Sequence, residues 1–267
     1  MDSTAPRVPR LAGALVTVPG AGVVLSGWLF PPAAPGRAAS AAVIVLHGWR
    51  PPGVWAALDV AGVARELATE GYAALALSLR GWPGSGGEDD GGLRQPDDIA
   101  AALDWLASRP GVDPARLGLL GFSQGGQVAL LTAARSASVK AVVAYYPVTD
   151  IDAWRETTSF PAIRDVYVPR VCTPGGTRVR SPVDRAASIT AAVMLIHGDR
   201  DTRVPTAQSV AMADALAAAR RRVELVLVPE ADHGFARREH PGVWRRALAF
   251  FEEHLRGETG SARPVVP

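Results

Sequence analysis

The chain lacks the features that mark disulfide-stabilised, membrane-spanning and nucleic-acid-binding proteins. One cysteine, Cys172, occurs among the 267 residues, which excludes an intrachain disulfide and a metal cluster built on cysteine. No uninterrupted apolar run is long enough to span a bilayer. The formal net charge of +2 is too small to indicate nucleic-acid binding. We therefore expect no membrane association, no nucleic-acid partner, and neither a metal nor an organic cofactor.

An apolar stretch near the N-terminus, residues 11–30, follows two arginines as the apolar part of a secretory signal peptide does. Pro19 and Gly20 interrupt this stretch, and the segments 15–18 and 23–29 each show the alternation of a half-exposed strand. This pattern predicts an edge β-hairpin rather than a signal peptide. On this interpretation we expect a cytoplasmic protein.

Beyond residue 40, apolar runs of strand length alternate with segments of helical periodicity. Runs that are apolar throughout predict strands buried on both faces, as in a parallel sheet covered by helices on both sides. The expected strands are 42–46, 73–79, 140–145, 192–196 and 223–228, with one more before residue 121, and the expected helices are 56–70, 96–108, 206–220 and 241–255, with one more after residue 123. We therefore expect a single α/β domain over residues 1–267, built on a mostly parallel, doubly wound sheet.

Residues 146–190 have no clear period and lie between the expected sixth and seventh core strands. The segment is too long for a simple connection, so we interpret it as an inserted cap or lid over the C-terminal edge of the sheet. Ligands bind at that edge in open α/β sheets. The cap is therefore expected to determine substrate choice.

A glycine-flanked serine is the first candidate for chemistry. The segment from Gly121 to Gly125 reads Gly-Phe-Ser-Gln-Gly and lies between a strand-like run and a helix-like run. A sharp turn from strand to helix strains the residue at its apex, and glycine on both flanks removes clashes with a Cβ atom. The hydroxyl of Ser123 would then stand at a helix N-terminus, which stabilises negative charge. This context predicts that Ser123 is a nucleophile.

A serine nucleophile needs a base to take its proton, and the base works best when a carboxylate orients it. Asp199 and Asp201 follow one later expected strand, and His233 follows the next. The order serine, aspartate, histidine is that of α/β-hydrolases rather than of chymotrypsin or subtilisin. His233 is the expected base, and either aspartate is a candidate for the acid.

A tetrahedral intermediate also needs two N–H donors for its oxyanion. One is expected from the residue after the nucleophile, Gln124. The other is expected from the loop after the first buried strand, with the N–H of Trp49 as first choice and that of Arg50 as the reserve. His47 and His197 each lie between a strand and a glycine, and we interpret both as residues that hold loops.

These motifs resemble those of the α/β-hydrolase superfamily, in particular the branch shared by prolyl-oligopeptidase-like catalytic domains and dienelactone-hydrolase-like serine esterases. The resemblance extends over about residues 15–255 and is carried by the segments 46–48, 112–126, 181–182, 196–205 and 232–235. It implies the α/β-hydrolase fold, with Ser123, Asp201 and His233 as the catalytic triad. It also favours Asp201 over Asp199 as the acid.

The sequence differs from known members of this branch in two ways, and both differences bear on which bond the protein is expected to cleave. Familiar dienelactone hydrolases have a cysteine nucleophile, whereas Ser123 favours ester or thioester hydrolysis by the serine route. Prolyl oligopeptidases carry a large propeller before the catalytic domain, and fewer than 50 residues precede the His47 loop. A peptidase is therefore the less favoured expectation. The segment 121–126 also resembles that of acyl-protein thioesterases.

Tryptophans and arginines give clues to the substrate. Four of the seven tryptophans fall in expected loops or in the cap: Trp49, Trp55, Trp82 and Trp154. Such side chains line apolar clefts, so Trp82 and Trp154 are the expected substrate-binding residues, and the alternative is that they only fix loops. A basic stretch of the cap, with Arg170, Arg178 and Arg180, either recognises an anionic group or forms a solvated face.

We therefore expect a serine carboxylic ester hydrolase that acts through acyl-Ser123 on a hydrophobic or aromatic small-molecule ester. One rival is a thioesterase, acyltransferase or cyclase of a biosynthetic pathway, in which the acyl group passes to another acceptor. Another rival is a receptor that keeps the fold without turnover. The acyl and alcohol groups and the oligomeric state are left open, a homodimer included.

Overall fold

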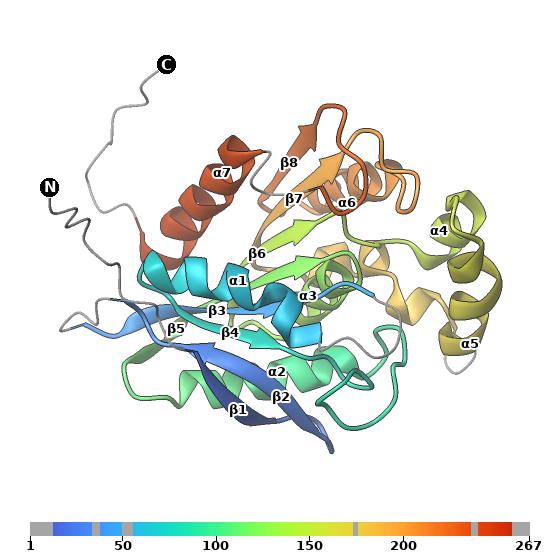
Figure 1. The fold of residues 1–267 in the computed structure, drawn as a ribbon. Coiled ribbons are helices and arrows are strands. Elements are labelled where there is room, and N and C mark those ends of the chain that lie inside the picture. Colours follow the sequence, from blue (N-terminus) through green and yellow to red (C-terminus); the bar gives the residue numbers. More distant parts are fainter. Residues whose placement is uncertain (1–12, 34–37, 50–55, 173–175, 236–239, 258–267) are drawn as a thin grey trace, which may run out of the picture.

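An eight-stranded sheet runs through the centre of the molecule in the order β1-β2-β4-β3-β5-β6-β7-β8 (Figure 1). The computed structural model describes residues 13–33, 38–49, 56–172, 176–235 and 240–257. The strands are β1 (Ala14–Pro19), β2 (Val24–Phe30), β3 (Ser40–Leu46), β4 (Ala73–Leu77), β5 (Val112–Phe122), β6 (Val139–Tyr145), β7 (Ala192–Gly198) and β8 (Val223–Val228). β2 is antiparallel to both of its neighbours, and the other neighbouring strands are parallel.

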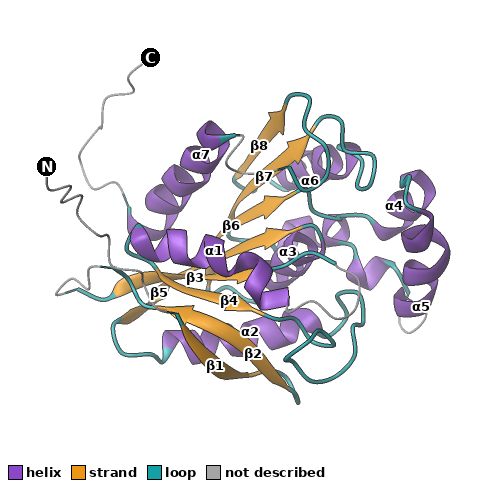
Figure 2. Ribbon diagram, in the orientation of Figure 1, coloured by secondary structure: helices purple, strands orange, loops and turns teal. Residues whose placement is uncertain are grey.

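Helices cover both faces of the sheet (Figure 2). One face carries α1 (Ala56–Thr69) and α7 (Pro241–Phe251), and the other carries α2 (Gln95–Ala107), α3 (Gln124–Arg135) and α6 (Ala207–Ala218). In β3, Ile44 belongs to the apolar cluster on one face and Val45 to the cluster on the other. Because both faces are buried, the central strands are apolar throughout, and the expected doubly wound architecture is confirmed.

The N-terminal hairpin is confirmed as β1 and β2, which form one antiparallel edge of the sheet. The last expected helix is shorter than predicted, because α7 ends at Phe251 and a π-helical turn, Glu252–Arg256, continues it. Among the described residues, no helix is both long enough and apolar enough to cross a membrane.

The described residues between β6 and β7, 146–172 and 176–191, form a series of short helices and turns that we call the cap segment. It contains α4 (Ile151–Thr157), a π-helical turn (Ile163–Tyr167), α5 (Val168–Cys172) and 3-10 turns at Arg178–Arg180 and Pro182–Ser188. Figure 1 shows α4 and α5 beyond the C-terminal ends of the parallel strands. Side chains of the cap segment pack around Trp154 and Tyr167 together with Val204, which follows β7. The cap segment therefore adds a small apolar layer at the edge where β5, β6 and β7 end.

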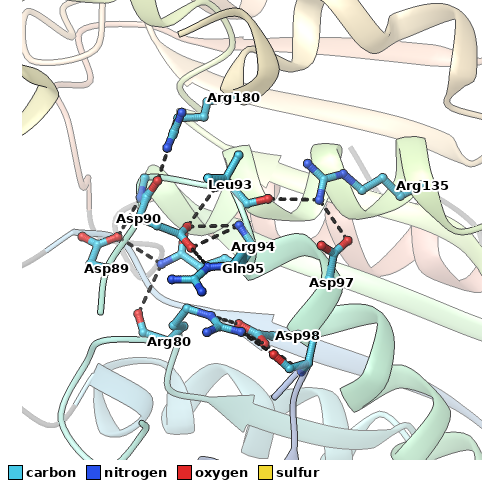
Figure 3. Close-up of polar contacts among 12 residues, drawn as sticks. Arg80, Asp89, Asp90, Leu93, Arg94, Gln95, Asp97, Asp98, Arg135 and Arg180 are labelled. Atoms are coloured by element: carbon cyan, nitrogen blue, oxygen red, sulfur yellow. Dashed lines mark hydrogen bonds and ion pairs between the residues drawn. The ribbon is translucent and has the colours of Figure 1, made fainter. Parts of the chain in front are cut away.

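A buried ion pair fixes the start of the loop between β4 and α2 (Figure 3). Arg80 donates to both carboxylate oxygens of Asp98, at 2.7 and 2.6 Å, and also donates to the carbonyl of Ala21 at 2.8 Å. The side chains of Arg80 and Asp98 are 3% and 1% exposed. The pair therefore links the N-terminal hairpin, the loop after β4 and the first turn of α2.

Arg80→Met should destabilise the fold by about 3–5 kcal/mol, because it leaves the Asp98 carboxylate buried without its partner. The expected fall in Tm is about 6–20 °C for a chain of this size. Arg164→Met is the matched control, since Arg164 pairs with Asp165 on the surface, where both side chains are about half exposed. Thermal unfolding of both variants checks the prediction, and equal Tm values would contradict it.

Candidate active site

Ser123 lies at the sharp turn between β5 and α3. Its backbone angles, φ 52° and ψ −114°, are in a region that a residue with a side chain rarely adopts. A Cβ atom on Gly121 would lie 2.2 Å from the carbonyl oxygen of Gly125, and one on Gly125 would lie 2.4 Å from that of Leu46. Both flanking positions therefore accept only glycine, which is the physical reason for the motif.

Asp201 and His233 form a direct pair. The Nδ1 atom of His233 lies 2.7 Å from the Oδ2 atom of Asp201. The other carboxylate oxygen, Oδ1, accepts backbone N–H groups from Arg203 at 3.0 Å and Val204 at 2.8 Å. Because both oxygens are occupied, the carboxylate is fixed in orientation and in turn fixes the imidazole ring.

A second histidine shares the same carboxylate. The Nε2 atom of His197 lies 2.8 Å from the carbonyl oxygen of Val204 and 3.3 Å from Oδ2 of Asp201, and its Nδ1 atom lies 2.7 Å from the hydroxyl of Ser209. Since a carbonyl only accepts, Nε2 carries a proton, and in the neutral ring Nδ1 accepts from Ser209. Burial raises the pKa of Asp201, but hydrogen bonds from His197 and His233 outweigh it and lower the pKa to about 2.

The structure brings Ser123 and His233 together at the wall of a cavity of about 540 Å³. His233 also lies with Ser123, Trp49 and Gln124 around a smaller adjoining cavity beneath the cap segment. The larger cavity is lined by aromatic rings and by two charged side chains: Trp49, Phe122, Tyr146, Phe160, Phe235, Asp59 and Arg203. A serine, an imidazole and a buried carboxylate in this order can perform nucleophilic acyl transfer.

Tyr146 is a residue of this site that sequence reasoning missed. It has a positive φ of 38°, its backbone N–H donates to the carbonyl of Ile196 at 2.7 Å, and its ring centre lies 4.6 Å from that of His233. Strained backbone beside a reactive group is typical of functional sites. The only signal in the sequence is its place directly after β6, at the edge where ligands bind.

The competing candidates are engaged elsewhere. Asp199 is exposed and accepts the backbone N–H of Glu230 at 2.7 Å, so it holds a surface loop. The Nε2 atom of His47 accepts the backbone N–H of Leu79 at 3.0 Å, and the ring is fully buried. The interpretation of His47 and His197 as residues that hold loops agrees with these contacts.

The two residues expected to supply the oxyanion donors, Gln124 and Trp49, line the smaller cavity together with Ser123. Gln124 is the first residue of α3, and Trp49 lines both cavities. A Cβ atom placed on Gly48 would lie 3.2 Å from the Cβ atom of Ser123, so the loop after β3 closely approaches the serine. The reserve donor, Arg50, lies outside the described residues.

One of the two tryptophans predicted to bind substrate is placed elsewhere. Trp82 does not line either cavity; it is 6% exposed, belongs to the sheet core and packs edge-on against His47 at 5.2 Å. The prediction for Trp82 is therefore corrected, because the loop after β4 folds inward instead of over the cavity. Trp154 lines the smaller cavity, and its indole N–H donates to the carbonyl of Arg203 at 2.8 Å.

The basic stretch of the cap segment does not form one anion site. Arg170 lies over the ring of Tyr167, and the exposed Arg178 lies 3.6 Å from a carboxylate oxygen of Asp184. Arg180 is fully buried and donates to the carbonyl of Asp90 at 2.9 Å. Among the described residues, no group of three or more histidine, cysteine, aspartate or glutamate side chains is placed to hold a metal ion.

Comparison with known proteins places this geometry in a family. The family model described as "Prolyl oligopeptidase family" matches residues 58–258. The uncharacterized peptidase YuxL of Bacillus subtilis is 28% identical over 255 residues, and the match covers 88% of this chain and 38% of that protein. A putative carboxymethylenebutenolidase of Salmonella typhimurium is 31% identical over 212 residues, covering 72% of this chain and 71% of the relative.

Solved structures agree with the sequence matches. A puromycin-hydrolyzing peptidase of Mycobacterium tuberculosis has a TM-score of 0.83 at 25% identity, covering 98% of this chain and 42% of that one. An esterase of Pyrococcus furiosus has a TM-score of 0.73 at 24% identity, covering 96% and 98%. The fold is that of the α/β-hydrolases, and the chain belongs to the prolyl oligopeptidase family of serine hydrolases.

Proposed function

We propose that this serine hydrolase cleaves carboxylic esters through an acyl-Ser123 intermediate, with Ser123, His233 and Asp201 as the catalytic triad. The observation that carries the proposal is the 2.7 Å contact between His233 and Asp201 at the wall of the cavity that contains Ser123. Each side chain comes from a different segment, and all three lie at the C-terminal edge of the sheet.

In the first half of the reaction, the Ser123 hydroxyl attacks the ester carbonyl while Nε2 of His233 takes its proton. The Nδ1 proton of His233 stays on the imidazolium and is held by the Asp201 carboxylate. The backbone N–H groups of Gln124 and Trp49 would stabilise the oxyanion. Collapse of the tetrahedral intermediate breaks the ester C–O bond, and the leaving alkoxide receives the proton from Nε2.

In the second half, a water molecule attacks the acyl carbon while Nε2 of His233 takes a proton from it. A second tetrahedral intermediate forms and collapses, the bond to the oxygen of Ser123 breaks, and the hydroxyl regains its proton. The ester and one water molecule are converted into a carboxylic acid and an alcohol, and Ser123 and His233 return to their starting states.

The lining of the cavity supports a small ester with a hydrophobic or aromatic group. Rings of Phe122, Tyr146, Phe160 and Phe235 line the site together with polar and charged side chains, so the rings can bind a hydrophobic or aromatic group of the ester. The relative from Salmonella, of which this chain covers 71%, has the name of an ester hydrolase, which also favours esters. The exposed guanidinium of Arg203 at the wall would favour an ester that carries an anionic group.

Peptide hydrolysis is the second candidate, because the family and YuxL carry peptidase names. An N-benzoyl amino acid methyl ester and the corresponding peptide amide separate the two, since they share the acyl group. We expect turnover of the ester, labelling of Ser123 by a fluorophosphonate, and no hydrolysis of the peptide above that seen with the Ser123→Ala variant. Hydrolysis of the peptide that is lost in Ser123→Ala would favour a peptidase. Absence of both labelling and turnover would favour a receptor, and ester products formed with added alcohols would favour an acyltransferase.

A further inference from the structure

The side chain of the residue after the nucleophile is anchored from two directions. Gln124 is 3% exposed, and its Nε2 atom donates to Oδ1 of Asp89 at 2.9 Å and to the hydroxyl of Tyr167 at 2.8 Å. Asp89 belongs to the loop after β4, and Tyr167 ends the π-helical turn of the cap segment. Both amide hydrogens of Gln124 are therefore used, and three distant segments meet at one side chain.

Asp89 is itself held in place. Its Oδ1 atom also accepts the backbone N–H of Gly91 at 3.1 Å and Nε2 of Gln95 at 3.1 Å, as Figure 3 shows for Gln95. Burial raises the pKa of Asp89 above its usual value, and hydrogen bonds with Gly91, Tyr167 and Gln124 offset this rise only in part. The carboxylate does not line either cavity. Any effect of Asp89 on turnover is therefore transmitted by its neighbours.

Further contacts make this anchorage rigid. Nε2 of Gln127, on the first turn of α3, donates to the carbonyls of Gly91 at 3.0 Å and Arg180 at 2.8 Å. Arg180 in turn donates to the carbonyl of Asp90 at 2.9 Å, and both residues are labelled in Figure 3. The loop after β4, the cap segment and the start of α3 thus form one cross-linked unit.

We propose that Asp89 and Tyr167 are positioning residues that act through Gln124, keeping the backbone N–H that follows Ser123 aimed at the oxyanion. The inference rests on the proposed function. Ser123 combines a φ of 52° with a ψ of −114°, and rotation of the peptide between Ser123 and Gln124 would bring ψ toward the allowed left-handed region, so a less strained arrangement exists. Anchoring the Gln124 side chain on both sides opposes rotation of that peptide and maintains the donor before substrate arrives.

The test is a double-mutant cycle on ester hydrolysis. Asp89→Ala is expected to lower kcat about tenfold and change KM less than twofold, because a misaimed oxyanion donor affects the transition state more than the ground state. Gln124→Met, which has similar length and no donor, should have an equal or larger effect. In the Gln124→Met background, Asp89→Ala should lower kcat no further.

Tyr167→Phe provides a second, milder variant that removes one hydroxyl and keeps the ring. It should lower kcat about threefold, again only when Gln124 is present. Tyr72→Phe is its control, since Tyr72 is a buried tyrosine whose hydroxyl donates to Glu252 at 3.4 Å. Asp113→Ala is the control for Asp89→Ala, because Asp113 accepts a similar backbone N–H, from Ala115 at 2.9 Å, at the opposite end of β5 from Ser123.

A boronic acid forms a tetrahedral adduct on Ser123 and therefore measures how well the oxyanion donors are placed. If Asp89 and Tyr167 had only a structural role, the affinity for the boronic acid would not change in proportion to kcat. We expect its inhibition constant to rise by the same factor by which kcat falls. Additive effects in the cycle, or a change confined to KM, would overturn the positioning role while ester hydrolysis by the wild type stands. A wild type that neither hydrolyses esters nor labels at Ser123 would overturn the proposed function and this inference together.

Discussion

Ser123→Ala is expected to lower kcat for ester hydrolysis by about six orders of magnitude while leaving KM within a few-fold of the wild type. The nucleophile is lost, whereas the aromatic wall of the cavity and the His233–Asp201 pair remain. Steady-state kinetics on an activated aryl ester, with fluorophosphonate labelling of the same preparations, measure the effect. Residual activity above about 1% would mean that another group initiates the reaction.

Ser123→Gly tests the strain at the same position. Alanine keeps the unfavourable φ of 52°, whereas glycine adopts positive φ without a steric penalty. We therefore expect Ser123→Gly to unfold with a free energy about 1 kcal/mol greater than that of Ser123→Ala. Denaturant unfolding of the two inactive variants isolates this difference from catalysis. Equal stabilities would contradict a strained backbone at the turn.

Asp201→Asn is expected to lower kcat by about 10⁴-fold with little change in KM. An asparagine amide facing Nδ1 of His233 would offer a hydrogen where the ring now donates one, so the imidazole would adopt the tautomer that cannot accept the proton of Ser123. Asp199→Asn is the matched control, because Asp199 lies two residues away and its carboxylate accepts the backbone N–H of Glu230 in a surface loop. It should retain activity within about twofold. A large loss of activity in Asp199→Asn would instead indicate that Asp199 is the acid of the triad.

The same Asp201→Asn variant should show a pH-dependent stability difference. The pKa of Asp201 is lowered from 3.8 to about 2, so the charged carboxylate stabilises the folded state above pH 4. This contribution, about 2 kcal/mol, is lost as the pH falls from 4 through 2. Unfolding free energies of wild type and variant between pH 2 and 7 should therefore converge at the acid end. A difference independent of pH would contradict the stabilised carboxylate.

Much of the fold follows from local sequence patterns. Strands such as β3 are apolar throughout because helices cover both faces, and the first β-hairpin alternates because it lies at the sheet edge. The meeting of Ser123, Asp201 and His233 was also predictable, because the ends of parallel strands share one edge of the sheet. Their catalytic roles remain the proposal that the substitutions above test.

What the sequence did not reveal depends on how loops fold back. Trp82 was predicted to face the substrate, yet its loop turns inward and places the indole against His47. Asp89 lies in a glycine-rich segment without a periodic pattern, and its contact with Gln124 joins positions far apart in the sequence. Tyr146 carries no motif at all. Side-chain contacts of this kind are set by tertiary packing, and short-range periodicity in the sequence does not reveal them.

Arg180, buried where the cap segment meets the loop after β4, has a consequence for selectivity. Its carbonyl accepts a hydrogen bond from Nε2 of Gln127, in the helix that begins at the nucleophile, so an acyl chain large enough to push the cap segment outward would also pull on that helix. Oversized substrates would then be penalised twice, by poorer fit and by slower chemistry. Substrate size would therefore affect the turnover number as well as the affinity.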